Sequence, residues 1–196
     1  MSARHFTRRQ RLVAAAVPAA LLASGGMVWY SSYSAFSATT SNPTNNWTAG
    51  TVALSDDDTN TAMFTATNLK PGSTGTKCIA VTSTGSLAST VKLYGTSYST
   101  TNGLGSNINL TVEEGTGATF SSCAGFTASS TIFSGTLASF GTTKTSFATG
   151  VGTWAPTGAA SETKSYRIVY TLSSSTPDTA QGGTAAMGFT WESQNS

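Results

Sequence analysis

Several segments of the chain alternate hydrophobic and polar residues with a period of two. The clearest are residues 107–113, 165–172 and 187–192, and in the first of them Ile108, Leu110 and Val112 alternate with polar residues. This alternation predicts strands that bury one face. Further strands are predicted at 47–54, 62–67, 77–84 and 90–98, with turn sequences at Pro71-Gly72, Gly85-Ser86 and Asn102-Gly103.

Eight or so antiparallel strands predict an all-β fold. We expect an antiparallel, jelly-roll-like β-sandwich with at most one or two short helices, preceded by an N-terminal signal helix. Helical spacing occurs at 131–140, where Phe133, Leu137 and Phe140 recur, although Gly135 and the β-branched residues oppose it. Residues 141–163 lack periodicity and predict a long loop around an anchoring Trp154.

The N-terminus has the order of a secretory signal. A basic segment, residues 2–11, is followed by an uncharged segment, residues 12–30, and then by small polar residues. This order predicts a signal peptide over 1–34 and a single β-sandwich domain over 35–196, with cleavage between Ser34 and Ala35. Cleavage after Ser37 is one alternative. Retention as a membrane anchor is another, because roughly 20 uncharged residues suffice to span a bilayer.

Charge is scarce and unevenly distributed. Four arginines lie within the first eleven residues, which leaves six Lys and Arg against eight Asp and Glu beyond them, a balance of 6 − 8 = −2. Serine and threonine number 29 and 36, together 65 of 196 residues. This composition argues against a coiled coil or a highly charged disordered chain. The lack of a basic cluster argues against a nucleic acid partner.

The chain has two cysteines, Cys78 and Cys123. In an exported protein they predict one structural disulfide, because a redox-active pair more often has the Cys-x-x-Cys spacing. The bond would close a loop of 46 residues from Cys78 to Cys123. Chain entropy gives such a loop an upper stabilisation of about 4 kcal/mol.

Histidine limits the enzyme classes that the chain can support. The only histidine, His5, lies inside the predicted signal. A Ser-His-Asp triad and a His-Glu-x-x-His zinc site both need imidazoles, so neither is expected in the mature protein. Two Ser-x-x-Lys matches, Ser89 with Lys92 and Ser161 with Lys164, are expected by chance in a chain with 29 serines.

Acidic and aromatic residues offer weaker candidates. Asp56, Asp58 and Asn60 have the spacing of a calcium loop, but Thr61 and Thr67 replace its Gly and Glu, so a solvated acidic turn is the favoured interpretation. We therefore predict no metal and no cofactor.

Glu113 and Glu114 are adjacent, so in a strand they point to opposite faces and cannot form a glycosidase pair. Four aromatic residues could form a glycan-stacking surface or pack in the core: Tyr94, Tyr98, Trp154 and Trp191.

Three stretches resemble the TasA/camelysin family. The first combines Gly25-Gly26 with Ala35-Phe36-Ser37 and the segment 47–54, as at the start of proteins processed by SipW-type signal peptidases. The second combines residues 69–72 with residues 84–87, and the third combines residues 181–183 with residues 189–192. The stretches span nearly the whole chain in the family's order, and the richness in Gly, Ser and Thr together with cysteine resembles an actinobacterial version.

The resemblance implies a jelly-roll sandwich, SipW-dependent export, and a secreted structural role in a biofilm matrix or at the cell surface. In some relatives fibres form when the N-terminal segment of one subunit completes the sheet of its neighbour. The resemblance also implies a competing function, because camelysins have been described as surface metalloendopeptidases. This chain departs from better-known members in its cysteine pair, its shorter length and its few charges.

The expected partners are further copies of the chain or related matrix proteins, and a signal peptidase during export. We expect the protein to contact a membrane only through an uncleaved signal peptide. Ala35, Phe36 and Ser37 open an extended, Ser/Thr/Asn-rich segment that can add to the exposed edge of a neighbouring sheet. A frayed terminus is the alternative for this segment, and a monomeric surface glycan-binding module is the alternative non-enzymatic function.

Overall fold

The computed structural model describes residues 48–195. From Ala49 onward these residues belong to one compact unit. The predicted signal peptide, its cleavage site at Ser34 and Ala35, and the predicted assembly segment Ala35-Phe36-Ser37 lie outside the described residues.

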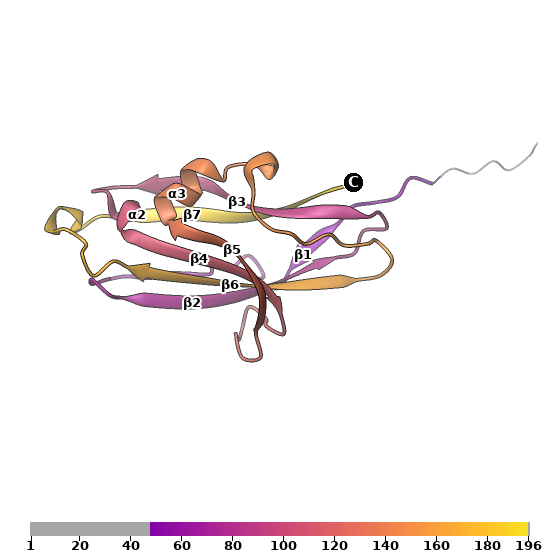
Figure 1. Ribbon diagram of the computed structural model, residues 1–196, viewed down its shortest axis with the longest axis horizontal. Coiled ribbons are helices and arrows are strands. Elements are labelled where there is room, and N and C mark those ends of the chain that lie inside the picture. Colours follow the sequence, from indigo (N-terminus) through magenta and orange to yellow (C-terminus); the bar gives the residue numbers. More distant parts are fainter. Residues whose placement is uncertain (1–47, 196) are drawn as a thin grey trace, which may run out of the picture. The chain divides into compact units, whose positions relative to one another are not determined.

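Two antiparallel sheets form a sandwich (Figure 1). The larger sheet has the order β1-β2-β6-β4-β5, and the smaller contains β3 and β7. The strands are β1 Leu54–Asp56, β2 Thr74–Ser83, β3 Ser89–Thr100, β4 Ile108–Thr116, β5 Thr127–Thr136, β6 Glu162–Leu172 and β7 Ala185–Asn195. The helices are α2 Leu104–Asn107, α3 Leu137–Thr143 and the 3₁₀ turns η1 Phe147–Thr149 and η2 Asp178–Ala180. The predicted all-β sandwich with one or two short helices is confirmed.

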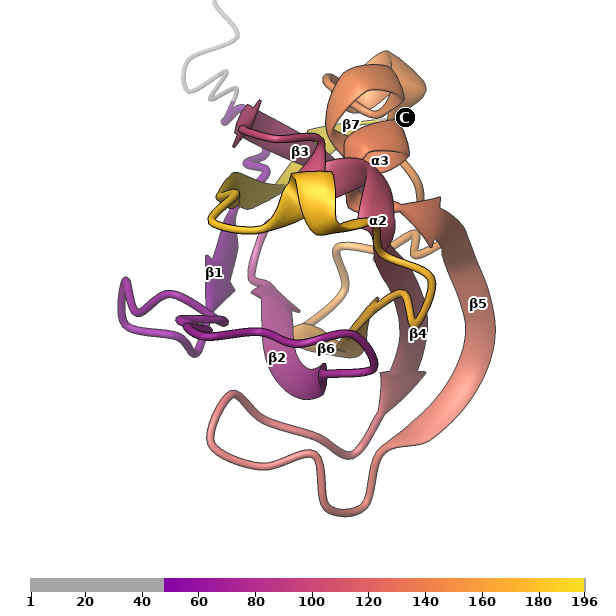
Figure 2. The ribbon, with the colours of Figure 1, turned by 90° about the vertical axis from the view of Figure 1, so that its left-hand side faces the viewer.

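The core lies between the sheets and is built from alternate residues of the strands. Its fully buried side chains include Ile79 of β2, Leu93 of β3 and Val112 of β4. Seen along the sandwich, the larger sheet curves from β2 and β6 around to β5, so that β5 approaches α3 (Figure 2). Phe140 of α3 is fully buried there and meets Phe133 of β5 edge-on, with ring centroids 4.8 Å apart.

The predicted helical spacing at 131–140 was wrong as a single element. Residues up to Thr136 form β5, because Gly135 disfavours a helix and the β-branched residues favour a strand. The chain then turns into α3, whose first turn is capped by the Thr136 hydroxyl, 3.0 Å from the backbone nitrogen of Ser139. The apolar spacing still brings Phe133 and Phe140 together, but across a strand-to-helix corner.

Two predicted strands are also corrected. The segment 47–54 pairs as a named strand only from Leu54 to Asp56, and residues 62–67 form no strand. Residues 62–67 attach through side chains instead: Met63 is buried in the core, and the Phe64 ring packs edge-on against Tyr170. The long loop predicted after residue 141 is confirmed beyond α3, with Trp154 buried as its anchor.

The predicted disulfide between Cys78 and Cys123 is confirmed. It ties β2 to the loop 117–126, whose backbone is also bound at Phe120. The two carboxylate oxygens of Asp57 accept backbone bonds from Ala80 and Phe120, each 2.8 Å long. This loop is therefore held by covalent and hydrogen bonds together.

Candidate functional site

The smaller sheet has one edge that no described strand covers. β7 pairs with β3 along its length, and no backbone bond joins the other side of β7 to another described residue. The outer edge of β3 is covered by the long loop that follows α3. Backbone nitrogens of Ser89, Val91 and Leu93 donate to carbonyls of this loop over 2.8–3.0 Å. A two-stranded sheet with one bare edge thus forms half of the sandwich.

The hydrogen-bond pattern shows which groups of β7 face the bare edge. Leu93 exchanges both backbone bonds with Val151, so its N–H and C=O point away from β7. Trp191 lies opposite Leu93, and in such a non-bonded antiparallel pair both residues direct their backbone groups outward. By the two-residue period of a strand, Phe189 and Ser193 do the same. Three residues therefore present free donors and acceptors along this edge.

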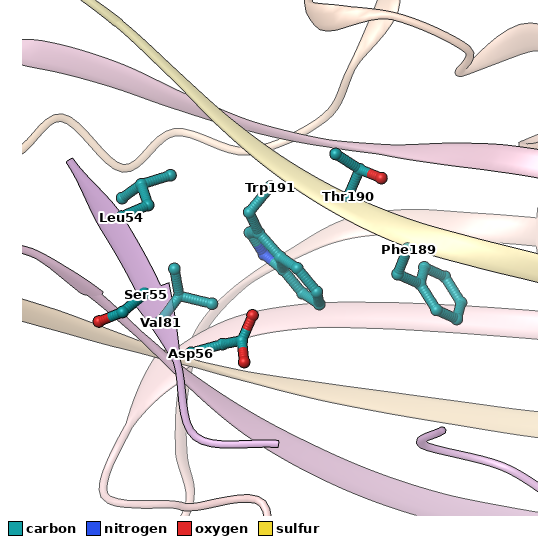
Figure 3. A pocket seen from close by; sticks show the side chains of 7 residues that line it. All are labelled: Leu54, Ser55, Asp56, Val81, Phe189, Thr190 and Trp191. Carbon is teal, nitrogen blue, oxygen red and sulfur yellow. The ribbon is translucent and has the colours of Figure 1, made fainter. Parts of the chain in front are cut away.

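Beside this edge the sandwich opens into a hollow of about 210 Å³ between β1 and β7 (Figure 3). Its walls are Leu54, Ser55 and Asp56 of β1, Val81 of β2, and Phe189, Thr190 and Trp191 of β7. Phe189 and Trp191 pack against the core but remain only partly buried. Phe189 and Trp191 therefore contribute side chains to the hollow and backbone groups to the bare edge.

Two polar groups in this hollow are of interest, the Trp191 indole nitrogen and the Asp56 carboxylate. The indole nitrogen of Trp191 is buried and has no hydrogen-bond partner among the described residues. The Asp56 carboxylate is directed toward the Trp191 ring (Figure 3). Partial burial raises the pKa of Asp56 above its ordinary value of 3.8, and the side chain of Asp58 and its charge raise this pKa further, whereas the backbone hydrogen bond from Asp58 lowers it.

The larger sheet ends in β5, but this edge differs from β7. The register places Ile132 and Ser129 as extra residues of β5 between its pairs with β4. Such bulges twist an edge away from straight pairing, which is one way natural sheets avoid association. β7 keeps an unbroken register from Asn195 to Gly188, so it is the straighter edge.

Two adjacent carboxylates of β4, Glu113 and Glu114, are engaged within the fold. Glu113 and Glu114 face opposite sides as predicted: Glu113 pairs with Arg167, and Glu114 is 1% exposed inside the sandwich. Glu114 accepts bonds from the backbone nitrogen and hydroxyl of Thr153 at 3.0 and 2.8 Å. Its carboxylate fixes the long loop to the core.

The metal-ligand candidates do not converge in residues 48–195. No three side chains of His, Cys, Asp or Glu there come close enough to hold a metal ion. Asp56 and Asp58 instead accept the backbone bonds of tight turns from Asp58 and Asn60, at 3.3 and 2.7 Å, which fits the solvated acidic turn. The donor set of the described residues does not fit a catalytic metal site.

The remaining sequence candidates are dispersed. Neither Ser-x-x-Lys match stands at a helix start: Ser89 and Lys92 lie on β3, and Ser161 immediately precedes β6, which contains Lys164. The four aromatic residues also fail to form one platform. Tyr94 bonds Glu192, Tyr98 packs against Gly141, Trp154 is buried, and Trp191 packs on Tyr166.

Sequence reasoning predicted β7 as a strand but did not find its bare edge or the hollow. Both depend on which strands fail to pair, and alternation along one strand carries no such signal. In the part of the chain that the structure describes, no helix is long and apolar enough to cross a membrane.

These features define a disulfide-linked, antiparallel β-sandwich in which the outer edge of the β7 strand has no partner among the described residues. The chain matches the model of the family described as camelysin metallo-endopeptidase over residues 9–141, and it belongs to this family. The resemblance seen in the sequence motifs is thereby confirmed. No curated protein matches the chain significantly. The described residues do not fit the metal centre that the family's description implies.

Proposed function

We propose that the protein is a secreted, non-enzymatic structural subunit of an extracellular matrix or cell surface, which joins copies of itself into fibres by strand addition. The bare edge of β7 carries this proposal. Exposed backbone groups beside a hollow are what β-strand addition requires, since the backbone supplies affinity and pockets select side chains. Family membership and a disulfide suited to an oxidising compartment support an extracellular location.

The proposed donor is the segment 35–47 of a second copy, freed by cleavage after Ser34. It carries no charged residue and contains Phe36. Pro43 cannot donate to a ladder, so the added strand would run from Ala35 to Asn42. Eight residues at about 3.3 Å each reach roughly 26 Å, enough to cover most of β7. Burial of the Phe36 ring in the hollow would contribute about 2 kcal/mol.

Assembly tests this function directly. The mature chain from Ala35 should form large species by light scattering and fibres by electron microscopy. Deleting residues 35–40, or Phe36→Asp, should abolish them while β-type circular dichroism and thermal melting stay nearly unchanged. Phe36→Leu is the matched control and should retain assembly. A wild type that stays monomeric at high concentration would favour the surface-binding module instead.

The family's description calls for a test of the alternative function. We expect the metal-loaded mature protein to leave casein uncleaved. This expectation is supported by the dispersed carboxylates of the described residues and by the position of His5 within the predicted signal. Chelator-sensitive cleavage that copurifies with the protein through several steps would establish the endopeptidase instead.

A further inference from the structure

We propose that Asn102 is a site of spontaneous deamidation, which converts the turn at Asn102 and Gly103 to isoaspartate and loosens the connection that leads into β7. The two residues form the exposed turn between β3 and α2. Their φ angles are 52° and 68°, and the backbone nitrogen of Leu104 donates to the carbonyl oxygen of Thr101 over 3.1 Å. This is the geometry of a type I′ turn, for which Asn-Gly is the favoured pair.

The reaction needs only the chain and water. The backbone nitrogen of Gly103 loses its proton to solvent and attacks the side-chain amide carbon of Asn102. A bond forms between this nitrogen and this carbon, the bond from the carbon to the amide nitrogen breaks, and the amide nitrogen takes up a proton and leaves as ammonia. Water then opens the succinimide ring at either carbonyl. One opening gives aspartate, and the other gives isoaspartate, in which the main chain runs through the former side chain.

Gly103 leaves its own nitrogen open to this attack. No described residue accepts a backbone hydrogen bond from it. A Cβ atom added at Gly103 would meet nothing within 4 Å, so the turn lies open to solvent. Ring closure requires the Asn102 backbone to rotate, which breaks the bond between Leu104 and Thr101 that closes the turn. Exposed turns that depend on so few bonds open at a low free-energy cost.

Other asparagines with the same backbone conformation lack this property. Asn68 is exposed and has a φ of 54°, but Leu69 follows it, and the leucine side chain crowds the attacking nitrogen. Asn60 has a φ of 63°, but the nitrogen of Thr61 already donates to a backbone carbonyl over 3.0 Å. Asn102 is the only asparagine of the chain that glycine follows. The reaction should therefore be confined to this turn.

The modification changes the contact between this turn and the connection before β7. The side-chain nitrogen of Asn102 donates to the carbonyl oxygen of Gln181 over 2.9 Å. Deamidation replaces this donor with a carboxylate oxygen, so two acceptors face each other. The backbone nitrogen of Thr101 still donates to the carbonyl of Thr184 over 2.9 Å, because neither group is modified. Residues 178–184 should therefore loosen while β3 and β7 stay paired.

Peptide mapping by mass spectrometry tests the site. The purified mature chain is incubated at about pH 6, 7 and 8, and fragmentation locates each change. Asn102 should gain about one dalton and become a substrate for protein isoaspartyl methyltransferase. The rate should rise up to about tenfold per pH unit, because the attacking group is the conjugate base of a backbone amide. Asn68 is the internal control and should stay unchanged.

Two variants separate the effect of the following residue from that of the backbone conformation. Asn102→Gln lengthens the side chain and should abolish the reaction, whereas Leu69→Gly should make Asn68 reactive. If Asn102 in the wild type proved as stable as Asn68 at pH 8, the proposal would be overturned.

Hydrogen exchange tests the structural consequence. In Asn102→Asp, the amides of residues 178–184 should exchange about five- to tenfold faster than in wild type, as expected for the loss of one hydrogen bond, while those between β3 and β7 stay protected. Asn102→Gly is the matched control, because it keeps the left-handed turn and removes the donor without adding a carboxylate. It should show a smaller increase. Unchanged exchange at 178–184 in Asn102→Asp would overturn the loosened connection.

Discussion

Single buried groups hold the irregular parts of this sandwich to its regular strands. Glu114 shows the principle: a carboxylate that is 1% exposed would be costly alone, but both of its oxygens accept bonds from Thr153. Tyr166 of β6, which lies opposite Glu114 in the larger sheet, is also 1% exposed and packs against Trp191 of β7 with ring centroids 5.3 Å apart. These residues lead to two predictions.

Glu114→Ala should destabilise the domain by about 3 kcal/mol, because the N–H and hydroxyl of Thr153 lose their acceptor in a dry interior. Glu114→Gln keeps one acceptor oxygen and should cost less. Urea unfolding followed by fluorescence measures both. A loss below about 1 kcal/mol for the alanine variant would mean that water replaces the carboxylate.

Tyr166 predicts a loss of stability at alkaline pH. Burial, and next the nearby Glu114 charge, raise the pKa of Tyr166 well above its ordinary value of 10.0. The unfolded chain then loses this proton at a lower pH than the folded chain, so the stabilisation is present below about pH 10 and declines above it. Thermal melts from pH 8 to 11 should fall less steeply in Tyr166→Phe than in wild type. Equal slopes would contradict this role.

Among the elements, loops and edges rather than strands distinguish this sandwich. The loop 117–126 is bound by the disulfide, by Asp57 and by Ser165, whose hydroxyl donates to the Ala118 carbonyl over 2.8 Å. β5 is bulged, whereas β7 is regular and unpaired on one side among the described residues. The domain therefore combines rigid loops with one edge that can accept a strand.

Removal of the disulfide should lower stability without changing the fold. Replacing Cys78 and Cys123 by serine frees a loop whose closure contributes at most about 4 kcal/mol, so we expect a loss of roughly 2–4 kcal/mol in urea unfolding. Because Asp57 still binds the loop at Phe120, circular dichroism should remain β-type. Exported wild-type protein should be two hydrogens lighter than the dithiol by mass spectrometry; two alkylatable thiols would refute the bond in solution.

The edge of β7 can be tested without removing its backbone bonds to β3. Ser193→Pro removes an N–H that points to the bare edge and should reduce assembly strongly while the monomer still folds. Ser193→Ala is the control, since it removes only the side-chain bond to Ser89, 2.9 Å long. Light scattering compares the two at matched concentration. Equal assembly of the proline variant and wild type would exclude this edge as the acceptor.

At the scale of the molecule, the alternation of hydrophobic and polar residues was sufficient to predict the sandwich and most of its strands. The period of two depends only on local geometry, so segments such as 107–113 and 165–172 could be identified without knowledge of their partners. The disulfide was predicted because only two cysteines are available to pair. The sequence motifs also indicated the TasA/camelysin family, which hydrophobic periodicity alone does not identify.

Only the tertiary structure determined which strand edge stays unpaired and where a hollow forms. The sequence of β7 has the same alternation as a fully paired strand, so its bare edge becomes visible only when the neighbours of every strand are known. The hollow likewise joins Leu54 and Asp56 to Trp191, residues more than 130 positions apart in the chain. Local propensity fixes an element, whereas an unpaired edge and a shared cavity are properties of how distant elements meet.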